Sequence, residues 1–177
     1  IDLCPPDAVR AGLNYSVSQA LPRTTLTAGE TTRDTRGADR RAGFIAAMQA
    51  HGLDATRLIA AGVPPISMRE GAEAMGRLLE TLPDTQAVIC VSDLSAFGAL
   101  TECQRRRVDV PGRLWIAGFG DYEIAGIAVP ALTTINPFPR DIGARTAELI
   151  LDVLDGRQNR PARIAISPEL LIRQSTG

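Results

Sequence analysis

The chain has 177 residues, 45% of them hydrophobic and 22% charged, which is the composition of a globular protein and excludes wholesale disorder. At this length folding buries roughly 70% of the surface that the unfolded chain exposes, so neither a metal nor disulfide bonds are required for stability. The net charge of −1 gives no indication of a surface for nucleic acids or anionic membranes.

The sequence also lacks the features of an exported or membrane-bound protein. No apolar run approaches the roughly 20 residues of a membrane-spanning helix, and the first residues, which include Asp2 and two prolines, do not resemble a secretory signal. The three cysteines, Cys4, Cys90 and Cys103, are scattered, so we expect no disulfide framework and no zinc site. These features predict a protein of the reducing cytoplasm that uses no metal or cofactor.

Short and nearly unbroken apolar runs predict the strands of a parallel sheet that is covered on both faces. These runs are Thr24–Ala28, Leu58–Ala61, Ala87–Val91 and Leu114–Phe119, and one more strand is expected at Ile1–Cys4. Helical patterns separate the runs, which implies right-handed crossover connections. The predicted fold class is therefore α/β, with a doubly wound parallel sheet.

Helices are expected between these strands, because apolar residues recur there at spacings of three and four. The predicted helices cover about Asp7–Ala20, Phe44–His51, Ser67–Leu82 and Asp93–Arg106. Gly52 is a suitable residue to end the second of them. Ser67 and Glu70 form a capping-box pattern at the start of the third, and Pro83 marks its end.

The repeating pattern of strand and helix changes after Phe119. Gly120–Pro130 is expected to be a loop, and Leu132–Ile135 a short extended segment. The tail, Arg163–Ile172, is expected to form two short strands that are separated near Pro168.

A long helix is predicted from Arg140 to Asp155, with Gly156 at its end. Its apolar face is formed by Ile142, Leu149, Ile150, Val153 and Leu154.

Polar side chains follow the carboxyl ends of three predicted strands. Gly29–Arg36 and then Arg40 follow the first, Ser92–Asp93 follow the Ala87–Val91 run, and Gly120–Asp121 follow Phe119. In an open parallel sheet, ligands bind beyond the carboxyl ends of the strands. We therefore expect these polar groups to converge on one crevice.

Arg40 is the strongest candidate for a ligand-binding residue. It lies four residues after Arg36 and four before Phe44, so it shares a helix face with both, and the apolar stripe directs it towards the crevice. A guanidinium group there offers a planar set of donors for a carboxylate, a phosphate or vicinal hydroxyls. The alternative is a solvated basic face, since Arg41 is adjacent and Asp39 is close enough to pair.

The other polar candidates have strong structural interpretations. Ser92 and Asp93 are common N-cap residues, and Asp121 can simply shape a turn. The only histidine, His51, lies at a helix end with no nucleophile suggested nearby, so we do not expect it to be catalytic. The chain has no dinucleotide-binding glycine motif, P-loop, zinc-protease motif or nucleophile elbow, so no enzyme is predicted.

Six motifs occur in order along most of the chain. They are DRRAGFIAAMQAHGL at 39–53, ICVSDLSAFGAL at 89–100, VPGRLWIAGFGDYEIA at 110–125, PALTTI at 130–135, IGARTAELIL at 142–151 and LLIRQST at 170–176. In this order they closely resemble the effector-binding domain of LacI/GalR-type bacterial transcriptional repressors. Within that family, GFGDYEIA and TECQRR (101–106) are most similar to the gluconate-utilisation repressors.

Such repressors carry an N-terminal helix-turn-helix followed by two α/β lobes that are similar to periplasmic sugar-binding proteins. The resemblance implies that residues 1–132 and 162–177 form the C-terminal lobe, and that 133–161 cross into the other lobe. Operator DNA would then be bound only through the N-terminal module. The helix at Arg140–Asp155 would pack on the first lobe, so in this chain its apolar face needs a substitute partner, through homo-oligomerisation or swapping.

The resemblance also implies roles for individual residues. Arg40 matches a family arginine that contacts effector hydroxyls or carboxylates, and Arg36 matches a neighbouring contact position. Ile66 matches a position that is often an aromatic residue stacked on the effector, and Ser92 a contact position that is often Asn. Phe97 matches a position that packs across the dimer, with ordinary core packing as its alternative.

Gly120 departs from the family pattern, since many sugar- and purine-binding members have Asp there. With Arg36 and Arg40 retained, the missing carboxylate favours a negatively charged effector such as gluconate. The implied function is allosteric: a sugar or sugar acid binds between two lobes and changes how a dimer fits its operator. The alternatives are a periplasmic sugar-binding protein of a transporter and a small α/β enzyme built on Asp93 or Asp121.

Overall fold

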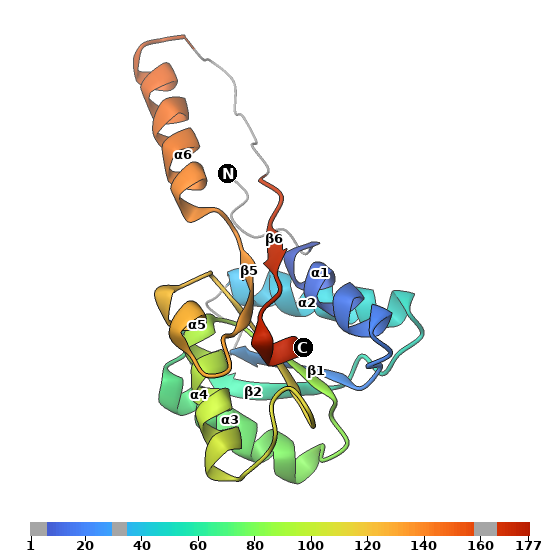
Figure 1. The fold of residues 1–177 in the computed structure, drawn as a ribbon. Helices are drawn as coiled ribbons and strands as arrows, with labels where there is room; N and C mark the ends of the chain where they lie inside the picture. Colours follow the sequence, from blue (N-terminus) through green and yellow to red (C-terminus); the bar gives the residue numbers. More distant parts are fainter. Residues whose placement is uncertain (1–6, 30–34, 158–165) are drawn as a thin grey trace.

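The computed structural model describes residues 7–29, 35–157 and 166–177. Its strands are β1 Thr24–Gly29, β2 Leu58–Gly62, β3 Ala87–Cys90, β4 Trp115–Phe119, β5 Thr133–Asn136 and β6 Glu169–Leu171. They form one sheet in the order β2–β1–β3–β4–β5–β6, in which the first five pair in parallel and β6 pairs antiparallel with β5 (Figure 1). The predicted α/β fold with a doubly wound parallel sheet is confirmed.

The helices are α1 Asp7–Ser18, α2 Thr35–Ala50, α3 Met68–Thr81, α4 Asp93–Arg105, α5 Glu123–Ile127 and α6 Pro139–Leu154. The prediction that all of Gly120–Pro130 is a loop is wrong, because α5 lies within it. Burial of Ala125 and Ala128 against the core explains this helix, and these long-range contacts leave no local pattern. The strand expected at Ile1–Cys4 lies outside the described residues, and of the two tail strands only β6 lies within them.

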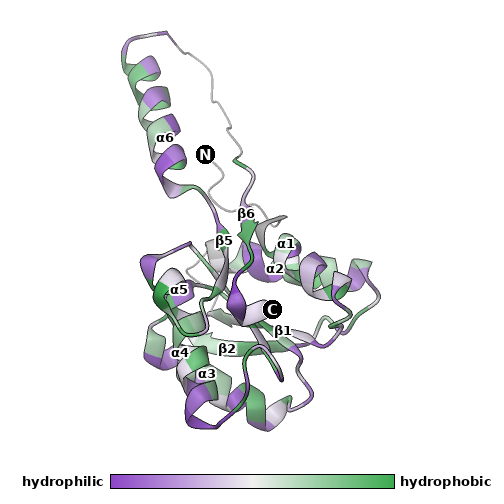
Figure 2. Ribbon diagram, viewed as in Figure 1, coloured by the Kyte–Doolittle hydropathy of each residue, from purple (hydrophilic) through white to green (hydrophobic). Residues whose placement is uncertain are grey.

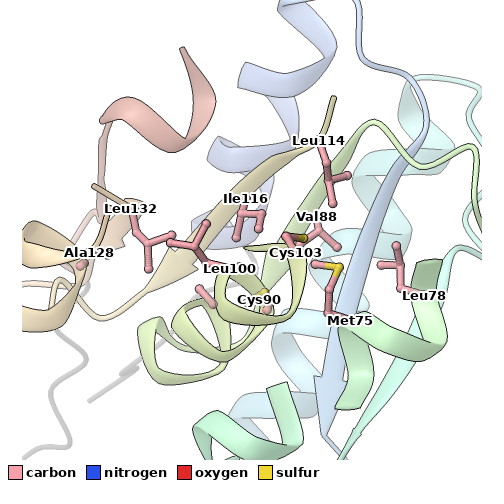
Figure 3. Close-up of a cluster of buried hydrophobic side chains, with 13 residues drawn as sticks. Met75, Leu78, Val88, Cys90, Leu100, Cys103, Leu114, Ile116, Ala128 and Leu132 are labelled. Carbon is pink, nitrogen blue, oxygen red and sulfur yellow. The ribbon is translucent and has the colours of Figure 1, made fainter. Parts of the chain in front are cut away.

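Two hydrophobic clusters hold helices to opposite faces of the sheet. In β3, Val88 and Cys90 face one cluster, which α3 and α4 cover (Figure 3). Ile89 and Val91 face the other cluster, which α1 and α2 cover. Because successive residues of a strand point to opposite faces, the unbroken apolar run in β3 is what a strand buried on both sides requires.

Helix α3 begins as its sequence predicts. The backbone N–H of Ser67 donates to Glu70 Oε2 at 2.7 Å, and the N–H of Glu70 donates to Ser67 Oγ at 3.2 Å, which completes the capping box. The same helix packs closely on α4, because a side chain at Gly71 or Gly98 would collide with the backbone of the facing helix. Local capping and close helix packing therefore fix this side of the sheet.

Helix α6 has a different environment from every other long helix. It stands away from the sheet (Figure 1), and none of its residues is buried. Its apolar residues, shown in Figure 2, include Ile150 and Leu154, which are 54% and 75% exposed. Across the described ranges, no helix combines the length and the apolarity needed to cross a lipid bilayer.

Candidate functional site

A cavity of about 360 Å³ opens at the carboxyl ends of β1, β3 and β4. Gly29 lines it at the end of β1, Val91 and Ser92 line it directly after β3, and Phe119 and Gly120 line it at the end of β4. The structure thus brings these three strand ends together around one hollow, as the sheet topology predicts.

Arg40 extends from α2 into this cavity. Its Nη1 donates a hydrogen bond of 2.8 Å to the carbonyl oxygen of Val91, and its Cζ lies 4.0 Å from the ring centroid of Phe119. The guanidinium is therefore held over an aromatic face at the end of β4, in a cation–π arrangement. Among the residues that the structure describes, Arg40 is the only charged residue that lines the cavity.

The remaining walls are mainly apolar. They are formed by Pro64, Pro65 and Ile66 after β2, Leu94 in α4, Tyr122, and Pro137, Pro139 and Ile142 around the start of α6. Ile66 is 7% exposed, so it contributes a small part of the surface. Apolar walls with a few fixed polar groups are typical of sites for small organic molecules.

Ser92 lies at the cavity and also caps α4. Its Oγ accepts a hydrogen bond of 3.2 Å from the backbone N–H of Ser95, and the Ser95 hydroxyl forms the reciprocal contact with the N–H of Ser92. The structural interpretation of Ser92 as an N-cap is confirmed. Its contact with an effector stays a prediction.

Asp93, a predicted ligand-binding residue, does not line the cavity. It is fully buried, its Oδ1 accepts a hydrogen bond of 2.6 Å from Thr134 Oγ1, and its Oδ2 accepts one of 2.7 Å from the backbone N–H of Tyr122. Burial raises the pKa of this carboxyl group. Because both oxygens are engaged inside the protein, this placement does not support the predicted ligand contact and instead joins α4 to the turn after β4.

Asp121 also turns away from the cavity. Its Oδ1 accepts a hydrogen bond of 2.7 Å from Arg173 Nη2, and its Oδ2 accepts one of 3.0 Å from Asn136 Nδ2. Its φ of +52° places it in the left-handed region, which Asp tolerates better than most residues. The carboxylate thus shapes the turn and joins it to the segments that hold Asn136 and Arg173, and this placement does not support the predicted ligand contact.

The backbone conformation of Gly120 and the space around it both favour glycine at this position. Its φ is +127°, and a Cβ built on it would lie 2.9 Å from Cε1 of Tyr122. The Tyr122 ring therefore occupies the space of a side chain at position 120. No pattern in the sequence predicts Tyr122 as a site residue. The only local indication is that an aromatic side chain follows Gly120 by two residues.

The other candidates lie elsewhere or outside the described side chains. Arg36 is in the first turn of α2, and its side chain lies outside the described part. Phe97 is partly buried and packs against the cluster beneath α3 and α4, so its dimer contact stays a prediction. His51 is exposed, and its Nε2 lies 2.9 Å from Asn14 Oδ1. The described residues contain no group of three or more His, Cys, Asp or Glu side chains suited to a metal.

Comparison with known proteins agrees with this geometry. Residues 19–176 match the family model described as a periplasmic binding protein-like domain. The chain belongs to this family. Because a solved LacI-family regulator superposes on it at 34% identity, the chain belongs within it to the LacI family. The cavity at the strand ends therefore lies in a domain whose family is described as similar to periplasmic binding proteins.

Among curated relatives of this LacI-family domain, the transcriptional regulator GntR of Pseudomonas aeruginosa is 34% identical over 81% of the chain and 42% of its own length. The regulator IdnR of Escherichia coli is 34% identical over 67% of the chain and 35% of its own length. The domain thus spans less than half the length of these relatives.

Solved structures extend the comparison to almost the whole domain. A LacI-family regulator from Silicibacter pomeroyi superposes with a TM-score of 0.89 at 34% identity, covering 96% of this chain and 61% of its own. GntR from Chromobacterium violaceum gives 0.88 at 33% identity, covering 96% and 62%. The complex of the regulator CelR with cellobiose gives 0.88 at 26% identity, covering 99% and 52%.

Proposed function

We propose that this LacI-family effector domain binds a small sugar acid in the cavity at the carboxyl ends of the strands. The observation that carries the proposal is the placement of Arg40, the only charged residue among the described lining residues. A guanidinium held over Phe119 matches a carboxylate or vicinal hydroxyls, and the proline and aliphatic walls match a carbon skeleton.

The two carboxylates that the sequence predicts at the crevice, Asp93 and Asp121, do not oppose an anionic effector. Asp121 is paired with Arg173, and Asp93 is buried with a hydrogen-bond donor on each oxygen. Among the described residues that line the cavity, the charged group is the Arg40 guanidinium, and its positive charge attracts a carboxylate. Gluconate is the acid that the sequence resemblance suggests first.

In the whole protein, the effector would act on the arrangement of two lobes. We assign residues 1–132 and 162–177 to one lobe and 133–161 to the crossing segment with α6, so this chain supplies half of the cleft. An effector that contacts both lobes favours one orientation of them, and in a cytoplasmic homodimer this changes how separate helix-turn-helix modules fit operator DNA. Phe97 is the candidate contact across that dimer.

The relatives named above are transcriptional regulators, which favours sensing over transport or catalysis. The proposal is tested by calorimetric titration of the chain with gluconate, glucose, cellobiose and a purine. We expect gluconate to bind more tightly than the neutral sugars, because only it carries a partner charge for Arg40. Binding of neutral sugars without binding of the acid overturns the proposal.

Arg40→Ala tests the role of the guanidinium directly. We expect the affinity for gluconate to fall by about 1.5–3 kcal/mol, the range for a hydrogen bond to a charged group. Arg41→Ala is the matched control, since Arg41 is exposed on the same helix and does not line the cavity. Thermal unfolding of both variants separates loss of binding from loss of fold, and an unchanged affinity in a folded Arg40→Ala protein assigns Arg40 a structural role.

A further inference from the structure

Tyr122 forms part of the cavity wall beside Gly120. Its ring atoms Cε1, Cδ1 and Cζ lie 2.9, 3.2 and 3.2 Å from the position of a Cβ on Gly120, and the residue as a whole is 49% exposed. The tyrosine therefore covers the end of β4 on one side, and part of its exposed surface lines the cavity.

The position of this residue is set by buried groups. Its backbone N–H donates to Asp93 Oδ2 at 2.7 Å, and the other oxygen of Asp93 accepts from Thr134 at 2.6 Å. Tyr122 is also the N-cap of α5, with its carbonyl oxygen accepting a hydrogen bond of 2.8 Å from the N–H of Ala125. The backbone that carries the ring is thus held between α4, β5 and α5, so the ring is presented at a defined place.

The aromatic groups of the cavity lie at the end of β4. Arg40 covers the ring of Phe119, and the next residue, Gly120, is covered by the ring of Tyr122. On the other side, Ile66 is aliphatic and almost buried. Among the described residues, a ligand in this cavity therefore meets one cation, Arg40 of α2, which lies over Phe119, and one accessible aromatic ring, Tyr122, which lies beside Gly120.

We propose that Tyr122 is a specificity-determining residue of this cavity, whose ring packs on the carbon skeleton of a carboxylic acid while the carboxylate lies at Arg40. This inference rests on the proposed function and adds how the site distinguishes among acids. A tyrosine ring offers a large and rigid apolar surface, so it favours acids with an accessible C–H face over compact anions such as acetate. The ring also occupies the space that a side chain at position 120 would need.

The two tyrosines of the chain provide a direct probe. Tyr15 stacks on Trp115 with 5.6 Å between ring centroids and does not line this cavity, so it is an internal reference. In protein labelled with ¹³C-tyrosine, we expect gluconate to shift the ring signals of Tyr122 and to leave those of Tyr15 in place, with Tyr122→Phe assigning the signals. Acetate at the same concentration is expected to shift the Tyr122 signals less.

Affinities from the same titrations test the specificity. Tyr122→Ala is expected to weaken gluconate binding about tenfold and acetate binding about twofold or less. Tyr122→Phe keeps the ring, so its affinity for gluconate is expected to lie within about twofold of that of the unmodified chain. The same is expected of Ile127→Ala, a control variant at an exposed residue of α5 that does not line the cavity.

The outcomes separate this inference from the proposal on which it rests. Equal gluconate affinity in the unmodified chain and in Tyr122→Ala overturns the role of Tyr122 alone. A loss in Tyr122→Phe as large as that in Tyr122→Ala overturns the ring contact and transfers the effect to the hydroxyl group. Absence of gluconate binding by the unmodified chain overturns both proposals.

Discussion

Helices α3 and α6 have similar lengths and similar apolar patterns but opposite environments. The 14 residues of α3 bury a stripe that includes Ala74, Met75 and Leu78, whereas the 16 residues of α6 bury nothing. In α3, Leu78 and Leu79 follow Met75 at spacings of three and four, and in α6, Val153 and Leu154 follow Ile150 at the same spacings. The comparison shows that an amphipathic pattern predicts a helix and its apolar face. The pattern does not determine which part of the structure packs against that face.

The solved relatives are longer than this chain. The chain superposes over 96% of its length on two LacI-family regulators but covers only 61–62% of theirs. We propose that α6 packs on the other lobe in a complete regulator. In this chain alone, its exposed face favours association with a second copy.

The largest expected contrast is in stability. Leu78→Ala in α3 removes a fully buried side chain and is expected to cost about 2–5 kcal/mol of the free energy of unfolding. Leu154→Ala in α6 changes a residue that is 75% exposed and is expected to cost less than about 0.5 kcal/mol. Urea denaturation of the two variants beside the unmodified chain, at a protein concentration that keeps the chain monomeric, measures both values, and similar losses would mean that α6 packs on the rest of its own chain.

A second test concerns association through α6. We expect the unmodified chain to self-associate in sedimentation experiments. The double substitution Ile150→Asp and Leu154→Asp is expected to lower the association constant by about 30-fold or more, since each change removes apolar contact area from the face. Ala144→Asp is the control, because Ala144 is exposed and lies on the opposite side of the helix by its spacing. A monomeric unmodified chain contradicts this use of α6.

The smallest expected effect concerns how the two helices begin. Ser67→Ala in α3 is expected to cost about 1 kcal/mol at neutral pH, because it removes the side-chain cap. A substitution of Phe138, the N-cap residue of α6, removes no such cap, because its side chain makes no capping hydrogen bond.

The capping box also predicts a pH dependence. Hydrogen bonds from the backbone N–H and the hydroxyl of Ser67 lower the pKa of Glu70 in the folded state. A lowered carboxyl pKa contributes stability above the pKa of the unfolded chain, and this contribution is lost as the pH falls through the folded value. The difference between the unmodified chain and Ser67→Ala should therefore shrink between pH 7 and pH 3 in denaturation curves, and a constant difference would contradict the role of the Glu70 charge.

Parts of the site follow from sequence rules, and parts do not. Arg40 at the crevice is predictable, because it precedes the buried Phe44 by one helical turn and follows the end of a parallel strand. The internal partners of Asp93 and Asp121 are not, since Thr134 and Arg173 lie 41 and 52 residues further along the chain. For this reason the carboxylates of Asp93 and Asp121, which the sequence predicts at the crevice, instead accept hydrogen bonds from groups within the protein.

The order and type of nearly every described element follow from the amino-acid sequence, because the periodicity of apolar residues and the capping pattern at Ser67 are local properties of the chain. The sequence also determined which strand ends form the cavity, since parallel strands place their carboxyl ends on one edge. Only the tertiary structure decided that Asp93 is buried, that α5 forms against the core, and that Tyr122 covers Gly120. Each of these depends on contacts between residues that meet only after the sheet has assembled, or on a glycine backbone conformation that local patterns do not encode.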